Sequence, residues 1–278
     1  MQSTLGDVRD LASLQKAMHL AQPEVVIHMA AQPLVVYGYT NPVETYATNV
    51  MGTVHLLESI RTCKSVKAVV NVTTDKCYEN KEWEWGYREN EPMGGHDPYS
   101  SSKGCAELVT AAYRNSFFFN ENSPALASAR AGNVIGGGDW ATDRLIPDTL
   151  KAFNIGEIVK VRNPLAVRPW QHVFDALYGY LLLSLNLEKD KKISGNSFNF
   201  GPKLNKKFTV KKLTYELSKL WKLNIIPFKF INKNKFYETK VLQLDTSKAR
   251  KMLKWKNYLS IKESIKITSE WYYHCFQI

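Results

Sequence analysis

The sequence contains no long apolar run. No stretch approaches the roughly 20 apolar residues that a membrane-spanning helix requires. The N-terminus lacks the basic and then apolar layout of a secretory signal, and the sequence has no internal repeats or low-complexity segments. These absences exclude a membrane-spanning or secreted protein, so we expect a soluble cytoplasmic protein with no membrane partner.

Cysteine is scarce and scattered. The chain has four cysteines, namely Cys63, Cys77, Cys105 and Cys275. They form no Cys-x-x-Cys pair and no histidine cluster lies near them in the sequence, so the ligand spacing of a structural zinc site is missing. We therefore expect no metal site and, in a cytoplasmic protein, reduced thiols.

Acidic residues are scarce in the second half of the chain. Residues 1–150 hold 12 Lys and Arg against 17 Asp and Glu, whereas residues 151–278 hold 25 against 9, which together give the net charge of +11. A basic surface can attract nucleic acid, but these lysines are spread along predicted helices and loops without the stacked aromatic residues of a nucleic-acid platform. The pattern indicates a solvated lysine-rich surface, and we expect no nucleic-acid partner.

The chain is long enough to build a full hydrophobic core. Of its 278 residues, 44% are hydrophobic and 12% aromatic, which suits one large domain or two closely apposed ones. Short apolar runs predict strands, and amphipathic spacing predicts helices. The predicted strands include 24–28, 69–72, 125–130 and 198–201, and the predicted helices include 11–21 after a cap at Asp10, 42–62, one beginning at 99, 174–187 and 209–221.

Two short motifs carry the chemistry. The sequence Thr-Thr-Asp-Lys at 73–76 follows a predicted buried strand, and open parallel sheets place chemistry at strand ends. Tyr99 and Lys103 lie four residues apart, and therefore on one face of the helix that begins after Pro98. A lysine ammonium near a phenol stabilises the phenolate, so Tyr99 is expected to accept a proton from a sugar hydroxyl near neutral pH.

Together the two motifs resemble those of the extended short-chain dehydrogenase/reductase family of nucleotide-sugar enzymes. Within that family, the segment Trp-Gly-Tyr-Arg-Glu-Asn-Glu-Pro-Met-Gly-Gly at 85–95 resembles CDP-glucose 4,6-dehydratases almost residue for residue. The segment Arg-Ala-Gly-Asn-Val-Ile-Gly-Gly-Gly-Asp-Trp at 130–140 resembles the same enzymes. Lys76 also resembles the CDP-glucose enzymes, because members acting on dTDP- and GDP-sugars usually have Asp-Glu where this chain has Asp75-Lys76. The resemblance covers nearly the whole chain.

The resemblance implies an α/β fold, with a Rossmann-like doubly wound parallel sheet that lacks its first β-α units and a smaller C-terminal substrate-binding domain. Residues 1–132 would form the NAD-binding domain, and 133–278 mainly the nucleotide-sugar domain, with some chain returning to the first. The family opens with a strand and a glycine-rich turn that binds the cofactor pyrophosphate. No such turn occurs near this N-terminus, and the glycines at 136–138 follow a late strand, so we expect a truncated start.

The resemblance also implies site residues. The catalytic residues would be Thr74, Asp75, Lys76, Tyr99 and Lys103. The cofactor-binding residues would be Asp7, Val8, Ala30, Ala31, Gln32, Asn49, Thr73, Tyr99 and Lys103. The substrate-binding residues would be Asn133, Arg144 and Arg168.

Several of these residues have a defined place in the family. The Asp-Val pair at 7–8 would lie against the adenine, and residues 30–32 beside the cofactor phosphates and ribose, while Asn49 would support the active-site strand. His28 is interpreted as a structural histidine. Each of the two arginines offers a guanidinium for charge-assisted bonds with a pyrophosphate.

The implied reaction is the NAD-dependent dehydration of CDP-glucose to CDP-4-dehydro-6-deoxyglucose. Tyr99, assisted by Lys103 and Thr74, would remove the proton of the carbon-4 hydroxyl. Asp75 in its acid form would protonate the departing carbon-6 hydroxyl, and Lys76 is the candidate base at carbon 5. The helices that begin at 42 and 99 are those that relatives pair into a homodimer.

Two other functions remain open at this point. A nucleotide-sugar 4-epimerase would keep Tyr99 and Lys103, but it has no need for the acid and base at Asp75 and Lys76. A non-catalytic remnant or binding protein without a working NAD site would explain the missing glycine-rich turn.

Overall fold

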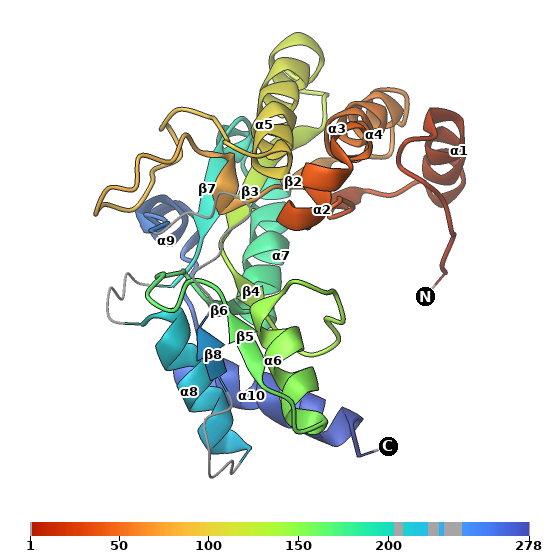
Figure 1. Cartoon of the computed structure of the whole chain (residues 1–278). Helices are drawn as coiled ribbons and strands as arrows, with labels where there is room; N and C mark the ends of the chain where they lie inside the picture. Colours follow the sequence, from red (N-terminus) through yellow and green to blue (C-terminus); the bar gives the residue numbers. More distant parts are fainter. Residues whose placement is uncertain (1, 203–207, 222–227, 231–240, 278) are drawn as a thin grey trace.

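The computed structural model describes residues 2–202, 208–221, 228–230 and 241–277 (Figure 1). Its described elements divide between a larger sheet with helices on both faces and a second region in which α6, α8 and α10 surround two small sheets (Figure 1). No described helix combines the length and the apolar character needed to cross a membrane.

The larger sheet contains four parallel strands in the order β1-β2-β3-β7. These are β1 (Val25–His28), β2 (Ala68–Val72), β3 (Ala125–Ala131) and β7 (Ser197–Phe200). All three pairings are parallel, with Val25 beside Ala68, Ala68 beside Ala125 and Ser128 beside Ser197. The predicted α/β fold with a parallel sheet is therefore confirmed.

Alternate residues of the central strands pack against two different layers. Val69 and Leu126 face the layer that holds α1 (Leu11–Ala21) and α4 (Gly52–Arg61). Ala68, Val70 and Ala127 belong instead to the cluster formed with α7 (Val173–Lys189) and α9 (Ser247–Leu253). Strand side chains alternate between the faces of a sheet, so a fully buried apolar strand serves both layers.

The predicted helix over 42–62 contains an irregularity. It consists of α3 (Pro42–Tyr46), the π-helical turn η1 (Ala47–Met51) and α4, without a break between them. Asn49 lies in the π turn and is buried. The short helix α2 (Val35–Thr40) precedes α3, and both pack against α5 (Pro98–Phe117). The π turn is a feature that the apolar spacing did not predict.

The second region follows β3. Two-stranded sheets join β4 (Val134–Ile135) to β6 (Gln171–His172) and β5 (Val159–Val161) to β8 (Phe228–Phe230). The helices are α6 (Leu145–Asn154), α8 (Val210–Leu220) and α10 (Ile261–Cys275), and their apolar faces share one core with β5. The later elements β7, α7 and α9 pack with the larger sheet. The domain boundary between residues 132 and 133 stays a prediction.

The first residues form no strand. Among the described residues 2–10, none pairs with β1, which is one edge of the larger sheet. The helix α1 begins as predicted, because the Asp10 carboxylate caps it by accepting a hydrogen bond from the Ser13 backbone N–H. Val8 packs closely on Gly52 of α4.

Candidate active site

The two predicted motifs meet at the carboxyl end of β2. The chain leaves β2 at Val72 and forms the 3₁₀ turn η2 (Asp75–Cys77), in which the Thr74 hydroxyl accepts a hydrogen bond from the Lys76 backbone N–H at 3.3 Å. The helix α5 packs against η2. Pro98 occupies its first turn and the Asp97 carboxylate caps it by accepting from the Ser100 backbone N–H at 2.9 Å.

Thr74 connects an acid to a phenol. Its hydroxyl donates to Oδ1 of Asp75 at 3.0 Å, and it also lowers the pKa of the neighbouring Tyr99 phenol. All three side chains are buried, with exposed fractions of 3% for Asp75 and 8% for Tyr99. The structure thus brings three of the predicted catalytic residues close together.

The Asp75 carboxyl is held in an environment that favours its neutral form. Burial raises the pKa of Asp75, while Lys76, Thr74 and Arg168 act in the opposite direction. Its Oδ2 atom has no hydrogen-bond partner among the described residues. A buried polar atom without a partner is costly in a folded protein and is typical of a group that acts on a ligand.

Gly132 leaves space beside this carboxyl. A Cβ at Gly132 would come within 3.1 Å of Asp75 Oδ2 and within 2.3 Å of Pro169 Cγ. Only glycine allows the chain that leaves β3 to approach both groups so closely. The carboxyl therefore lies at the junction of β2, β3 and the segment that carries Arg168.

The expected effect of Lys103 on Tyr99 is not found. Burial raises the pKa of Tyr99 to about 12, and the nearby Asp75 adds to this, while Thr74 and Arg144 oppose it. The Lys103 amine instead donates to the Val72 carbonyl at 3.4 Å. The predicted phenolate near neutral pH stays a prediction, because burial in the chain by itself favours the neutral phenol. Helix spacing reports that two residues share a face and not how deeply they are buried.

Lys103 is itself buried, with 7% of the residue exposed. Burial lowers the pKa of Lys103 to about 8, while the carboxylate of Glu107 opposes this shift. The charge of the Lys103 amine also affects His28, which lies at the end of β1. Burial, with a contribution from Lys103, lowers the pKa of His28 to about 4, so the imidazole is neutral, as the structural interpretation of this residue requires.

Both predicted arginines act on the catalytic groups through their charge. Arg144, at the N-cap position of α6, lowers the pKa of Tyr99 and pairs with Asp139 at 2.8 Å. Arg168 lowers the pKa of Asp75. Asn133 is exposed, and its backbone carbonyl accepts a hydrogen bond from the Gln171 N–H at 3.1 Å. The two arginines therefore contribute positive charge to the catalytic residues, and the substrate-binding role of all three residues stays a prediction.

The predicted cofactor residues after β1 lie next to α5. Ala30 is exposed and Ala31 half-buried, so a ligand can reach this strand end. The backbone of Gln32 is bonded to the Asn49 side chain, which accepts from its N–H at 2.8 Å and donates to its carbonyl at 3.0 Å. Asn49 also donates to Ser102 on α5 at 2.8 Å. Its side chain therefore joins the loop after β1 to the helix that carries Tyr99.

The other predicted cofactor residues lie in different settings. Asp7 is exposed and paired with Arg9 at 2.5 Å, and this hydrogen-bonded pair lowers the pKa of Asp7 to about 2. The backbone carbonyl of Val8 lies 3.0 Å from Nδ1 of His55. Thr73 is buried and donates its hydroxyl to Glu107 at 2.5 Å.

The residues around Lys103 fit a ligand that carries hydroxyl groups, such as a ribose of NAD. An ammonium carries three N–H donors, and for Lys103 the described residues supply one acceptor, Val72, at 3.4 Å. The small residues at the end of β1 lie on the same side of α5 as Tyr99, because Gly38 of α2 packs on the Tyr99 backbone and on Gln32. The sequence contains no glycine-rich turn for the pyrophosphate half.

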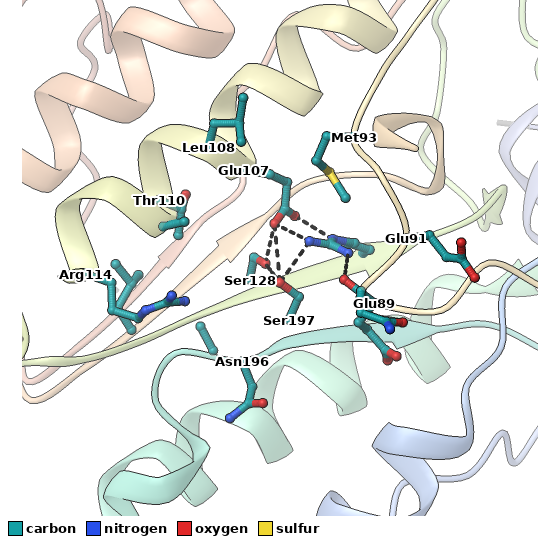
Figure 2. A pocket seen from close by; sticks show the side chains of 15 residues that line it. Glu89, Glu91, Met93, Glu107, Leu108, Thr110, Arg114, Ser128, Asn196 and Ser197 are labelled. Atoms are coloured by element: carbon teal, nitrogen blue, oxygen red, sulfur yellow. Dashed lines mark hydrogen bonds and ion pairs between the residues drawn. The ribbon is translucent and has the colours of Figure 1, made fainter. Parts of the chain in front are cut away.

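Sequence reasoning missed Glu107 and Arg130 as site-supporting residues. Both side chains are 4% exposed and form a buried ion pair of 2.7 Å beside the Thr73 hydroxyl. Figure 2 shows the Glu107 carboxylate directed toward Ser128 and Ser197. The sequence did offer a signal, because both charged residues fall at positions predicted to be buried. Glu107 follows Lys103 by one helical turn, and Arg130 lies near the end of a buried strand.

The ion pair also borders a cavity of about 210 Å³, whose lining includes neither Asp75 nor Tyr99 (Figure 2). This cavity is therefore separate from the junction of the catalytic residues. Within the described part of the chain, no group of three or more His, Cys, Asp or Glu residues is arranged to bind a metal ion.

Comparisons with known proteins agree with this geometry. A CDP-glucose 4,6-dehydratase of Salmonella typhimurium is 48% identical over 276 residues, which cover 98% of this chain and 77% of the relative. CDP-paratose 2-epimerase of Salmonella typhi is 23% identical, over 96% of this chain and 82% of the relative. This chain is therefore shorter than both relatives.

Solved structures share the fold. A dTDP-glucose 4,6-dehydratase of Streptomyces venezuelae, solved with NAD and TYD bound, superposes with a TM-score of 0.85 at 23% identity, covering 97% of this chain and 78% of the other. UDP-glucose 4-epimerase of Thermotoga maritima also superposes with a TM-score of 0.85, at 22% identity, covering 97% of this chain and 84% of the other. The family model described as GDP-mannose 4,6 dehydratase matches residues 1–268. The chain therefore belongs to the GDP-mannose 4,6 dehydratase family of NAD-dependent epimerases and dehydratases, as an enzyme homologous to CDP-glucose 4,6-dehydratase.

Proposed function

We propose that this chain dehydrates CDP-glucose to CDP-4-dehydro-6-deoxyglucose, with NAD as its cofactor. The observation that carries the proposal is the arrangement in which the Thr74 hydroxyl donates to Asp75 at 3.0 Å and lowers the pKa of the neighbouring Tyr99. It joins a buried carboxyl that favours its neutral form to a phenol, and this reaction needs an acid at carbon 6 beside a proton acceptor at carbon 4.

The choice of substrate rests on the segment around the acid. Asp75-Lys76 is the pairing that resembles CDP-glucose enzymes, and the relative with 48% identity is such an enzyme. Arg144 and Arg168 bring positive charge to the same junction, where they suit the pyrophosphate of a nucleotide sugar. Asn133, which is exposed two residues after β3, is the residue that we propose to contact the sugar.

The first step oxidises carbon 4 of the glucose. Bound NAD would supply the hydride chemistry, as acceptor of the hydride from carbon 4 and as its donor to carbon 6. Tyr99 accepts the proton of the carbon-4 hydroxyl at its phenolate oxygen, beside the Thr74 hydroxyl. The phenol has a pKa near 12, so the phenolate must be stabilised by positive charge, of which Arg144 supplies a part in this chain.

The second step eliminates water across carbons 5 and 6. The new ketone acidifies the carbon-5 proton, which Lys76 accepts in its neutral form. Asp75 gives its proton to the carbon-6 hydroxyl, which leaves as water. Burial favours the protonated carboxyl that this step requires.

The last step returns a hydrogen to each of the two carbons. Carbon 6 receives the stored hydride and carbon 5 receives a proton back from Lys76. The proton that Tyr99 took from the carbon-4 hydroxyl passes to Asp75, which restores both side chains. The net change is the loss of one water molecule, with no net change in the cofactor. A 4-epimerase would instead return hydride to carbon 4, for which neither Asp75 nor Lys76 is needed.

We further propose that the enzyme is a cytoplasmic homodimer. Large apolar side chains are exposed on the helices that relatives pair, with exposed fractions of 82% for Val43 on α3 and 61% for Leu108 on α5. The four cysteines are free, which suits a reducing compartment. Light scattering of the purified chain tests the dimer, and the Leu108→Glu variant should shift its mass toward the monomer.

The experiment for the reaction is incubation of the purified chain with CDP-glucose and NAD. The expected product is the 4-keto-6-deoxy nucleotide sugar, formed without net NADH. No product with added NAD would contradict the proposed function, and a 4-epimer would support the epimerase instead.

A further inference from the structure

Glu107 and Arg130 form a doubly bonded ion pair between α5 and β3. Arg130 Nη2 lies 2.7 Å from Glu107 Oε2, and its Nε lies 2.9 Å from Oε1. The two side chains are 4% exposed. A buried charge without its partner is strongly unfavourable, so the bidentate pair fixes the position of α5 relative to the sheet.

The carboxylate of this pair also holds the beginning of the catalytic turn. Thr73 Oγ1 donates to Glu107 Oε1 at 2.5 Å, and Thr73 immediately precedes Thr74 and Asp75. Thr73 is further tied to β3, since its backbone N–H donates to the Ala129 carbonyl at 2.8 Å. A helix side chain therefore determines where the turn starts.

The guanidinium of the same pair holds the end of the turn. Arg130 Nη1 donates to the Tyr78 hydroxyl at 2.9 Å, and Tyr78 directly follows η2. The Tyr78 ring lies against the guanidinium, 5.0 Å from ring centroid to Arg130 Cζ. Tyr78 is fully buried and donates its own hydroxyl to Asn199 on β7 at 2.7 Å.

The ion pair thus reaches both flanks of a segment whose middle contacts Tyr99. We propose that Glu107 and Arg130 act as a positioning unit, which holds the segment from Thr73 to Tyr78 so that Asp75 meets the helix that carries Tyr99. The inference rests on the proposed function for its catalytic consequence and on the geometry alone for the positioning.

If the ion pair had a structural role alone, the loss of any one of its hydrogen-bond partners would affect the turn equally. Ser197 on β7 also contacts it, at 3.4 Å to Oε2, and accepts a hydrogen bond from Arg130 Nη2 at 2.9 Å. Ser197 touches the same ion pair but no residue of the turn, so Ser197→Ala is the matched control. Removing Glu107 or Arg130 outright would strand a buried charge, which makes those variants poor tests.

The test is hydrogen exchange of the backbone amides of 75–77, followed in the chain alone. Thr73→Val and Tyr78→Phe each remove one hydroxyl and leave the ion pair intact. Each is expected to speed exchange of these amides about tenfold, the scale of one hydrogen bond to a charged group, whereas Ser197→Ala leaves them within about twofold. No change in either variant, a rise in only one of them, or an equal rise in Ser197→Ala would overturn the positioning role.

Kinetics then separate this inference from the proposed function. For CDP-glucose turnover, Tyr78→Phe is expected to lower kcat about tenfold with KM unchanged, and Ser197→Ala to change neither. Full kcat in Tyr78→Phe would refute the catalytic consequence. A wild-type chain that makes no product would refute the proposed function, while the exchange data would still decide whether the ion pair positions the turn.

Discussion

The hydroxyl of Thr74 donates to Oδ1 of Asp75 at 3.0 Å and lowers the pKa of the neighbouring Tyr99. One threonine therefore lies between the group that would donate a proton at carbon 6 and the group that would accept one at carbon 4. The two chemical halves of the proposed reaction can be separated by substituting the residue at either end of this contact.

Asp75→Asn keeps the shape of the side chain and removes its ability to act as an acid. We expect it to oxidise carbon 4 and accumulate enzyme-bound NADH, while formation of the 4-keto-6-deoxy product falls by about 100-fold or more, the usual contribution of a general acid. Rapid mixing with CDP-glucose, followed by the absorbance of NADH, measures carbon-4 oxidation. An assay of the 4-keto-6-deoxy product measures the later steps. Asp190→Asn, at an exposed cap, is the control. Loss of both halves would argue against an acid role.

Tyr99→Phe removes the phenol while keeping the buried ring. The expected result is loss of carbon-4 oxidation by about 100-fold or more, and with it every later step, because no NADH forms. The exposed Tyr215→Phe on α8 serves as its control. NADH formation at the wild-type rate would show that another group accepts the carbon-4 proton.

Lys76→Ala tests the proposed base. It is expected to permit carbon-4 oxidation and block the exchange of the carbon-5 hydrogen with solvent, because the amine that takes this proton is gone. Deuterium uptake at carbon 5 in heavy water, read by mass spectrometry, is the measurement, with the exposed Lys64→Ala as control. Equal loss of oxidation and exchange would count against the base role.

Lys103→Met tests the cost of a buried amine. Burial lowers the pKa of Lys103 to about 8, so between that value and the usual 10.5 the unfolded chain binds the proton and the folded chain does not. The stability of the wild type should therefore rise with pH across this window. The variant should lack that rise and be more stable by about 1–2 kcal/mol near neutral pH, at the expense of turnover. Urea midpoints at several pH values provide the measurement, and a less stable variant at neutral pH would contradict this explanation.

Local sequence signals located most of the elements around the site. The apolar run over 69–72 predicted β2, Asp10 predicted the start of α1, and Pro98 predicted the start of α5, because each signal acts within a few residues. The π turn around Asn49 was missed. Its side chain bonds to Gln32 and Ser102, which are distant in sequence, so no local pattern encodes it.

The chemistry of the site was harder to predict than its residues. Spacing along α5 placed Tyr99 and Lys103 on one face but did not reveal that burial would raise one pKa and lower the other. The pair of Glu107 with Arg130 depends on sheet register and helix packing, and it joins residues 23 apart in sequence. The roles assigned to the individual site residues stay predictions until the variants are measured.

The central claim is that hydride leaves carbon 4 and returns to carbon 6 of the same sugar within one active site. The most direct measurement uses CDP-glucose carrying deuterium at carbon 4, incubated with this chain and unlabelled NAD, with the product examined by NMR. We predict a 4-keto-6-deoxy product with the deuterium at carbon 6. Deuterium returned to carbon 4 of a 4-epimer, or a substrate left unchanged, would contradict the proposed function.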